Sequence, residues 1–115
     1  MNNLKNGVNL IGRTGIDPII RTFDNGVKLA KFPLAINETI MEAEGKAVKT
    51  QWHQIVAWGK KAELIEKFVS KGQMLAVDGK LINRLIKDRK SGEQKKITEI
   101  QVNEILLINP NKKAS

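Results

Sequence analysis

Apolar and polar residues alternate with a period of two along most of the chain, and this pattern is typical of half-buried β-strands. The alternation predicts strands over about residues 5–13, 27–38, 48–58, 73–86 and 99–108. A turn signal, Asp24-Asn25-Gly26, separates the first two of them. The chain is therefore predicted to be mostly β.

The last two predicted strands indicate which faces are buried. Ile100, Val102 and Leu106 fall on one face of the final strand, whereas Glu99 falls on the other face with polar residues. In the preceding strand, Gly79 stands where a side chain is expected. A glycine inside a strand usually marks a bulge or a sharp bend, so we expect an irregularity there.

One segment has helical spacing. It predicts a helix from Lys60 to Lys71 with Gly72 at its C-cap, because four apolar residues line one side: Leu64, Ile65, Phe68 and Val69. Three strands, a helix and two strands follow one another in the order of the OB-fold. The predicted fold is a mostly β, five-stranded OB-fold barrel with one helix between strands 3 and 4.

The same reading places two long loops and one domain. The loops are expected at Thr39–Lys46 and Lys87–Lys96. Residues 1–108 form the predicted domain, and residues 109–115 have the composition of a short, basic, disordered tail.

The charge balance points to a polyanionic partner. The 115 residues include 20 Lys and Arg against 12 Asp and Glu, a formal net charge of +8. No stretch approaches the ~20 apolar residues of a membrane-spanning helix, and the polar N-terminus lacks a signal-peptide core. We therefore expect a cytoplasmic protein with no membrane partner.

Catalysis is not predicted. The chain has no Cys, and His53 is its single histidine, which excludes zinc–cysteine sites and cysteine nucleophiles. Within a predicted strand, His53 is expected to be buried or at an interface. The carboxylates form no pair suited to acid–base or metal chemistry, so no cofactor or metal is expected.

Two tryptophans are the clearest candidates for a binding site. Trp52 and Trp58 share one face of a predicted strand, about 20 Å apart at ~3.3 Å per residue. Large aromatic residues are usually buried, but the opposite face already carries Ile55 and Ala57, and Gln54 lies on the tryptophan face. In a basic chain this arrangement favours platforms on which bases stack.

The lysine-rich segments have two interpretations. Most charge runs form a solvated surface, and this alternative stands for the lysines of the predicted helix. The Lys87–Lys96 segment holds five basic and two acidic residues, and the strand face with Lys80 and Arg84 also has locally unbalanced charge. These segments are the candidates for phosphate contacts.

Several segments together resemble the bacterial single-stranded DNA-binding protein family over about residues 4–108. They are Gly7–Pro18 with Arg21, Phe32–Glu38, Thr50–Lys60 and Val77–Leu81. The resemblance implies an OB-fold homotetramer, associated with the nucleoid, that binds and protects single-stranded DNA in replication, recombination and repair. It also implies stacking by Trp52 and Trp58, basic contacts from Lys60 and Arg84, and a subunit-interface position for His53.

The chain departs from the family pattern in places. Ile40 and Ile86 stand at positions that can hold further stacking tryptophans, and an isoleucine has no π face, so weaker stacking is expected. Family members usually end in an acidic tip that recruits replication and repair proteins, whereas this chain ends Asn109–Ser115 without an acidic residue. The protein is expected to depend more on phosphates than on bases.

The candidate residues form two sets. Those for nucleic-acid binding are Trp52, Trp58, Lys60, Arg84, Lys80, Arg13, Lys31, Ile40, Ile86, Lys87, Arg89 and Lys90. Those for the subunit interface are His53, Leu4, Val8 and Leu10. Two alternatives stay open: a primosomal replication-restart-type OB-fold protein that acts mainly as a dimeric adaptor, and an OB-fold nuclease.

Overall fold

The computed structural model describes residues 5–108, and its strands close into a barrel. The elements are β1 (Val8–Thr14), β2 (Ile19–Thr22), β3 (Lys28–Glu42), β4 (Gly45–Trp58), α1 (Lys60–Phe68), β5 (Met74–Lys87) and β6 (Gln94–Ile108). The sheet order is β1-β5-β6-β4-β3-β2, and pairing of β1 with β3 closes the barrel. This confirms the predicted OB-fold with its helix between the third and fourth barrel strands.

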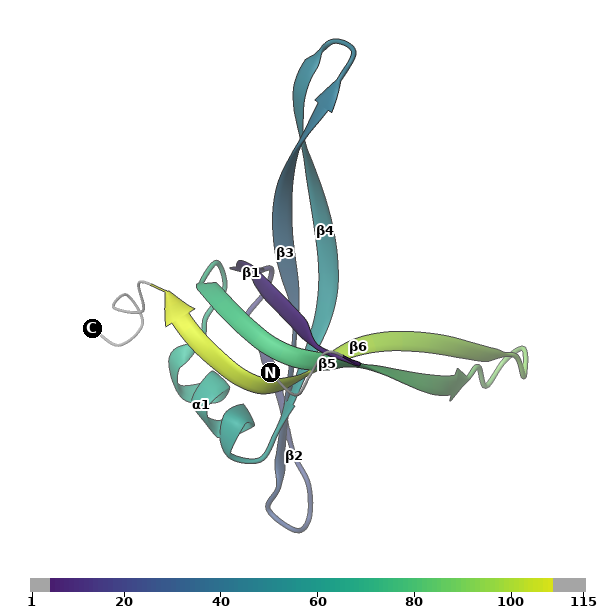
Figure 1. Cartoon of the computed structure of the whole chain (residues 1–115). Coiled ribbons are helices and arrows are strands. Elements are labelled where there is room, and N and C mark those ends of the chain that lie inside the picture. The colour runs from purple at the N-terminus through teal and green to yellow at the C-terminus, as the bar shows by residue number, and fades with distance from the viewer. Residues whose placement is uncertain (1–4, 109–115) are drawn as a thin grey trace.

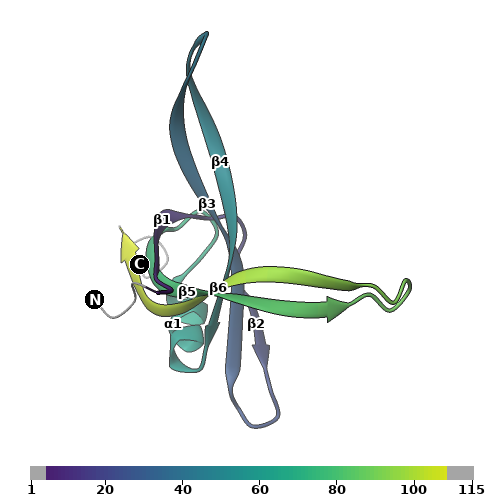
Figure 2. The ribbon, with the colours of Figure 1, turned by 45° about the vertical axis from the view of Figure 1, so that its right-hand side comes forward.

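Two long hairpins extend beyond the barrel (Figures 1 and 2). The segment Thr39–Lys46 was predicted to be a loop, but β3 and β4 stay paired through it as far as Glu42 and Gly45. The predicted loop at Lys87–Lys96 likewise shortens to residues 88–93. Alternation reveals a strand only where one face is buried, so the solvated ends of these arms gave no such pattern.

Two prolines border or interrupt strands. Pro18 directly precedes β2, a short strand that the sequence pattern did not predict. Pro33 lies inside β3, and its carbonyl accepts a hydrogen bond from the Gly15 N–H at 2.9 Å. Because the N–H and C=O of a strand residue point to the same side, the missing N–H of Pro33 faces β1 and costs no bond between β3 and β4.

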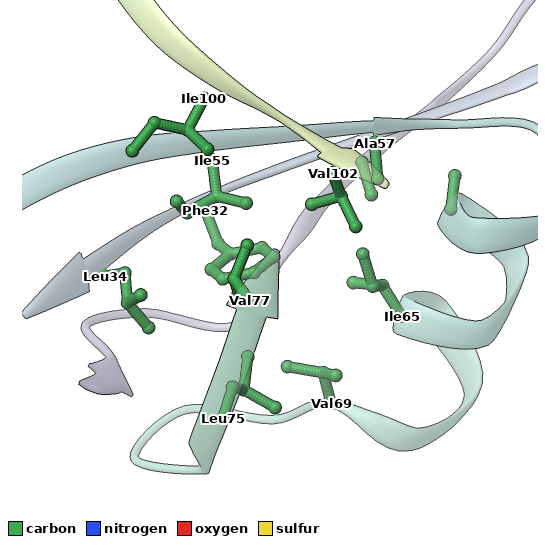
Figure 3. Close-up of a cluster of buried hydrophobic side chains, with 12 residues drawn as sticks. Phe32, Leu34, Ile55, Ala57, Ile65, Val69, Leu75, Val77, Ile100 and Val102 are labelled. Carbon is green, nitrogen blue, oxygen red and sulfur yellow. The ribbon is translucent and has the colours of Figure 1, made fainter. Parts of the chain in front are cut away.

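The core fills the barrel with side chains from β3, β4, β5, β6 and α1 (Figure 3). Phe32, Ile55 and Ile65 are fully buried in it. The helix ends at Phe68, earlier than predicted, because Val69 turns extended and buries its side chain in the core. Within residues 5–108 no helix has the length and apolar character needed to cross a membrane.

A bulge between β5 and β6 changes which face later residues occupy. The register shifts between Asp78 and Gly79, so Asn103 of β6 has no residue opposite it. The irregularity predicted at Gly79 is confirmed. One extra residue moves every following side chain to the other face. Leu106, predicted to share the buried face of Val102, is consequently 66% exposed.

Candidate nucleic-acid interface

Both tryptophans lie on the outward face of β4. As the alternation predicted, this strand buries Ile55 and Ala57 in the core, while Trp52 and Trp58 are 59% and 46% exposed. Tryptophan is a large apolar residue that usually buries most of its surface. Two of them exposed on one strand therefore indicate a surface that binds something.

Trp52 lies against the connection between β1 and β2. A Cβ atom added to Gly15 would come within 2.6 Å of Cζ3 of the indole, so the tryptophan fits only because this residue is glycine. Strand registers align Arg13, Ala35 and Trp52 across β1, β3 and β4. The structure thus places Arg13 on the Trp52 face, where its guanidinium donates to the Gly72 carbonyl at 3.0 Å.

Trp58 stacks on a residue that the sequence did not reveal. The rings of Phe23 and Trp58 have centroids 5.7 Å apart and planes inclined by 23°. The Arg21 guanidinium lies 4.8 Å from the Phe23 centroid, a cation–π distance. Phe23 directly precedes the Asp24-Asn25-Gly26 turn, and this position was the available sequence signal for it. The turn folds β2 back along β3 toward the end of β4.

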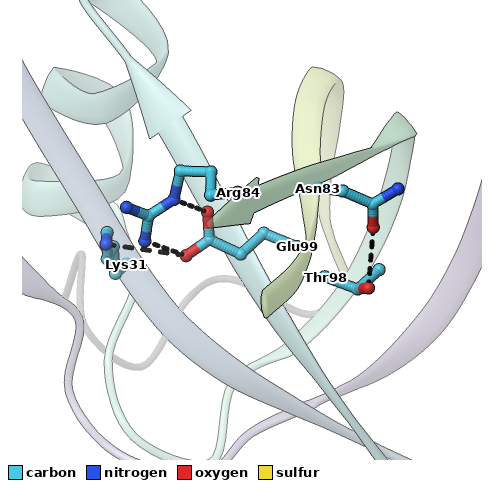
Figure 4. A network of polar contacts seen from close by, with 5 residues as sticks. All are labelled: Lys31, Asn83, Arg84, Thr98 and Glu99. Atoms are coloured by element: carbon cyan, nitrogen blue, oxygen red, sulfur yellow. Dashed lines mark hydrogen bonds and ion pairs between the residues drawn. The ribbon is translucent and has the colours of Figure 1, made fainter. Parts of the chain in front are cut away.

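A cleft of about 240 Å³ lies beside Trp58, with one wall from β2 and β3 and another from β5 and β6. Its charged groups are those of Arg21, Lys31, Arg84 and Glu99. Figure 4 shows the central contact: Arg84 donates from Nε to Glu99 Oε1 at 2.9 Å and from Nη2 to Oε2 at 3.1 Å. The Lys31 ammonium lies 3.5 Å from Oε2.

Arg84, predicted to lie on a strand face of unbalanced positive charge, therefore has an acidic partner that the sequence pattern did not reveal. Glu99, expected on an exposed polar face, is only 4% exposed and pairs with Arg84 across the β5–β6 hairpin. The Arg84 hydrogen bond lowers the pKa of the Glu99 carboxyl below its ordinary value; burial opposes this, and the charge of Lys31 lowers the pKa further. Glu99 is thus held as a carboxylate inside the cleft.

The remaining candidates are spread over the same side and the hairpin arms. Ile86 shares the β5 face of Arg84, and Lys60 begins α1 two residues after Trp58. Ile40 is separated from this group, because the β3–β4 register places it on the hairpin face opposite Trp52. Exposed cations follow the β5–β6 arm and its turn: Lys80, Lys87, Arg89 and Lys90.

The turn at the end of the β5–β6 arm is ordered by Asp88. Its carboxylate accepts a hydrogen bond from the Lys90 N–H at 2.9 Å, and this bond lowers the pKa of Asp88. Its backbone N–H donates to the Glu93 carbonyl at 2.8 Å. The basic residues of this arm are therefore presented by a defined turn.

The candidates for the subunit interface lie in different parts of the fold. Val8 and Leu10 are partly buried against the core from β1, on the face opposite Ile11. His53 is half-buried and pairs with Leu34 in the β3–β4 register. Leu4 lies outside the described residues.

A closed OB barrel with two exposed tryptophans, one of them beside a cationic cleft, defines a class of protein: OB-folds with the surface features of nucleic-acid binders. The model of the single-strand binding protein family matches residues 5–108. The chain belongs to this family.

Known relatives agree with this membership. A single-stranded DNA-binding protein of Bacteroides thetaiotaomicron is 39% identical over 108 residues, which cover 91% of this chain and 66% of the relative. For one from Staphylococcus aureus, the identity is 36% over 101 residues, with 88% and 64% covered. A chain of the Plasmodium falciparum SSB complex with ssDNA is 33% identical with a TM-score of 0.80, covering 90% of this chain and 95% of that one. This chain spans less than two thirds of the length of these two curated relatives.

Proposed function

We propose that this protein binds and protects single-stranded DNA, without strong sequence preference and without catalysis, in replication, recombination and repair. The observation that carries the proposal is the outward face of β4, where Trp52 and Trp58 are exposed and Trp58 borders a cleft with Lys31 and Arg84. Family membership and the likeness to a solved SSB complex with ssDNA support it. They favour it over the primosomal adaptor.

Binding combines two kinds of contact. Bases stack on the exposed indoles, a contact worth ~1–3 kcal/mol per base that every base can make. Lysine and arginine side chains hold phosphates by charge, which carries no sequence information. The phosphate contacts come from Arg13, Lys31, Lys60 and Arg84 and from the exposed cations of the β5–β6 arm.

A gel-shift comparison tests the proposal. Labelled oligo-dT is incubated with the protein at low salt, with and without Mg²⁺, beside a duplex of the same length. We expect a shifted complex with the single strand, weaker binding of the duplex and no cleavage products. Preference for the duplex would contradict the proposed substrate, and products that require Mg²⁺ would indicate a nuclease.

We further propose that the working unit is a homotetramer. On the described part of the chain, Val8–Ile11 of β1 pairs with β5 along one edge and with no strand along the other. Ile11 and Leu106 are 61% and 66% exposed beside an apolar cleft of about 470 Å³ over β1, β5 and β6. An open strand edge next to exposed apolar side chains favours pairing with another copy.

Mass measurement in solution tests the assembly. We expect a tetramer for the wild type and a smaller species for Ile11→Glu, because a charge at this position would be buried in the interface. A wild-type dimer would favour the adaptor, and a monomer would contradict assembly. His53, Leu4, Val8 and Leu10 are the further interface candidates that substitution can examine.

The cellular setting is proposed on the same basis. We place the protein in the cytoplasm beside the nucleoid, with replication or repair proteins as further partners. Residues 1–108 are proposed to act as one domain; residues 109–115, predicted as its basic tail, lie outside the described residues.

A further inference from the structure

One acidic side chain is buried in the cleft proposed to bind phosphates. Among residues 5–108, Glu99 is the only ionisable side chain that is buried. A carboxylate repels phosphate, and burying it costs free energy unless cations compensate. Its position among the cations that would hold DNA therefore calls for a physical role.

The contacts of Glu99 suggest that role. Its carboxylate accepts both Arg84 hydrogen bonds and lies 3.5 Å from the Lys31 ammonium. The two cations remain reachable from solvent, with Arg84 44% and Lys31 32% exposed, whereas Glu99 is 4% exposed. An incoming phosphate would thus contact Arg84 and Lys31. Because Glu99 cancels one of their two positive charges, the net charge of these three residues is +1.

We propose that Glu99 is the internal counter-anion of this cleft, a positioning residue that limits the affinity and the salt dependence of phosphate binding by Arg84 and Lys31. It holds the guanidinium in one orientation and cancels one unit of charge before DNA arrives. With one positive charge cancelled, the group neutralises less phosphate charge, and fewer of the counterions condensed on the DNA are released on binding. A bound strand is accordingly released more readily. This inference rests on the proposed binding of single-stranded DNA.

Four proteins separate charge from structure. The three-residue group carries +1 in the wild type, +2 in Glu99→Gln, zero in Arg84→Gln and +1 in the double variant. Oligo-dT affinity is measured for each over a series of salt concentrations. We expect Glu99→Gln to bind more tightly at low salt, with a slope of log affinity against log salt steeper by ~0.7. That slope is about a fivefold greater loss of affinity for each tenfold rise in salt.

The other variants complete the design. Arg84→Gln should have a shallower slope than the wild type, and the double variant should return to the wild-type slope. If Glu99→Gln binds no more tightly at low salt or keeps the wild-type slope, Glu99 has only a structural role and the inference is overturned. Circular dichroism verifies that each variant is folded.

If Glu99→Gln fails to fold, a second comparison still tests the inference. The double variant removes the buried charge together with its main partner, so it is the better tolerated change. It should bind more tightly than Arg84→Gln, with a slope steeper by ~0.7; equal slopes overturn the inference. A wild type that fails to bind oligo-dT at low salt overturns the proposed function as well, which distinguishes the two failures.

Discussion

Trp52 and Trp58 are held by different neighbours. Trp52 lies over Gly15, whose missing side chain makes room for the indole. Trp58 has one ring face against Phe23. Because both indoles are held by packing and remain about half exposed, little side-chain entropy is left to lose when a base stacks on them.

Removing one indole should weaken binding without unfolding the protein. For Trp52→Ala we expect oligo-dT affinity to fall about five- to 150-fold, the equivalent of ~1–3 kcal/mol for one stacked base. Fluorescence anisotropy of labelled oligo-dT measures it. Leu64→Ala is the matched control, since Leu64 is 49% exposed on α1 and lines an apolar cleft that contains neither tryptophan. Equal losses for the two variants would contradict a stacking role.

Phe23 should act through Trp58. Phe23→Leu removes the ring but keeps an apolar side chain. We expect affinity for oligo-dT to fall by up to about twelvefold, because the ~1.5 kcal/mol upper value for an aromatic pair limits what the stack can contribute by holding Trp58 in place. In a Trp52→Phe background, Trp58 is the sole tryptophan and its emission reports the same event. Phe68→Leu on α1 is the control. Unchanged affinity for Phe23→Leu would rule out a role for the stacked pair.

Acid should reveal the Glu99 ion pair. Its pKa is lowered in the folded protein by Arg84 and Lys31, so the pair stabilises the fold above the ordinary value of 4.5 and loses this contribution as pH falls below it. Urea unfolding across this range should show wild-type stability falling more steeply than that of Glu99→Gln. Parallel curves would contradict the lowered pKa of Glu99.

The β5–β6 hairpin owes its geometry to one bulge. The register shift at Gly79 determines which residues of β5 and β6 face each other in the arm beyond it. Ile82 is consequently opposite Glu99, and Arg84 lies diagonally across from this carboxylate on the same face. The ion pair in the cleft is thus a consequence of strand register.

Gly79 is a position where the bulge can be tested. A Cβ atom there would come within 2.3 Å of the Gln101 carbonyl oxygen, and backbone cannot yield as a side chain would. We expect Gly79→Ala to lower the free energy of unfolding by about 3 kcal/mol in urea titrations. Gly26→Ala is the control: it has open space at φ +86° and should cost about 1 kcal/mol. Similar losses would contradict a steric requirement at Gly79.

The barrel was predictable because its strands each bury one face, which gives the alternation a physical cause. The ends of the arms were not, since hydrogen bonds hold them and neither face is covered there. The same distinction applies to the site. The outward position of Trp52 was predictable, because Ile55 lies on the other, buried face of β4. The Arg84–Glu99 and Phe23–Trp58 contacts depend on a bulge and on hairpin register, which local alternation does not contain.

Across the whole molecule, aromatic and cationic groups share the outer surface of the barrel. Arg13 and Trp52 lie together on one part of it, and Trp58, Lys31 and Arg84 surround the cleft at another. The net charge of +8 adds attraction for a polyanion over the entire surface. With two exposed tryptophans, we expect the protein to depend more on phosphate contacts than on base stacking.

Tryptophan fluorescence measures base stacking and phosphate contacts together when oligo-dT is titrated over a range of salt concentrations. We expect saturable quenching at low salt, because the proposed contact places bases directly on Trp52 and Trp58. The logarithm of affinity should fall linearly with the logarithm of salt concentration, by ~0.7 for each phosphate neutralised. Absence of quenching together with absence of a mobility shift at low salt would contradict single-stranded DNA binding at this surface.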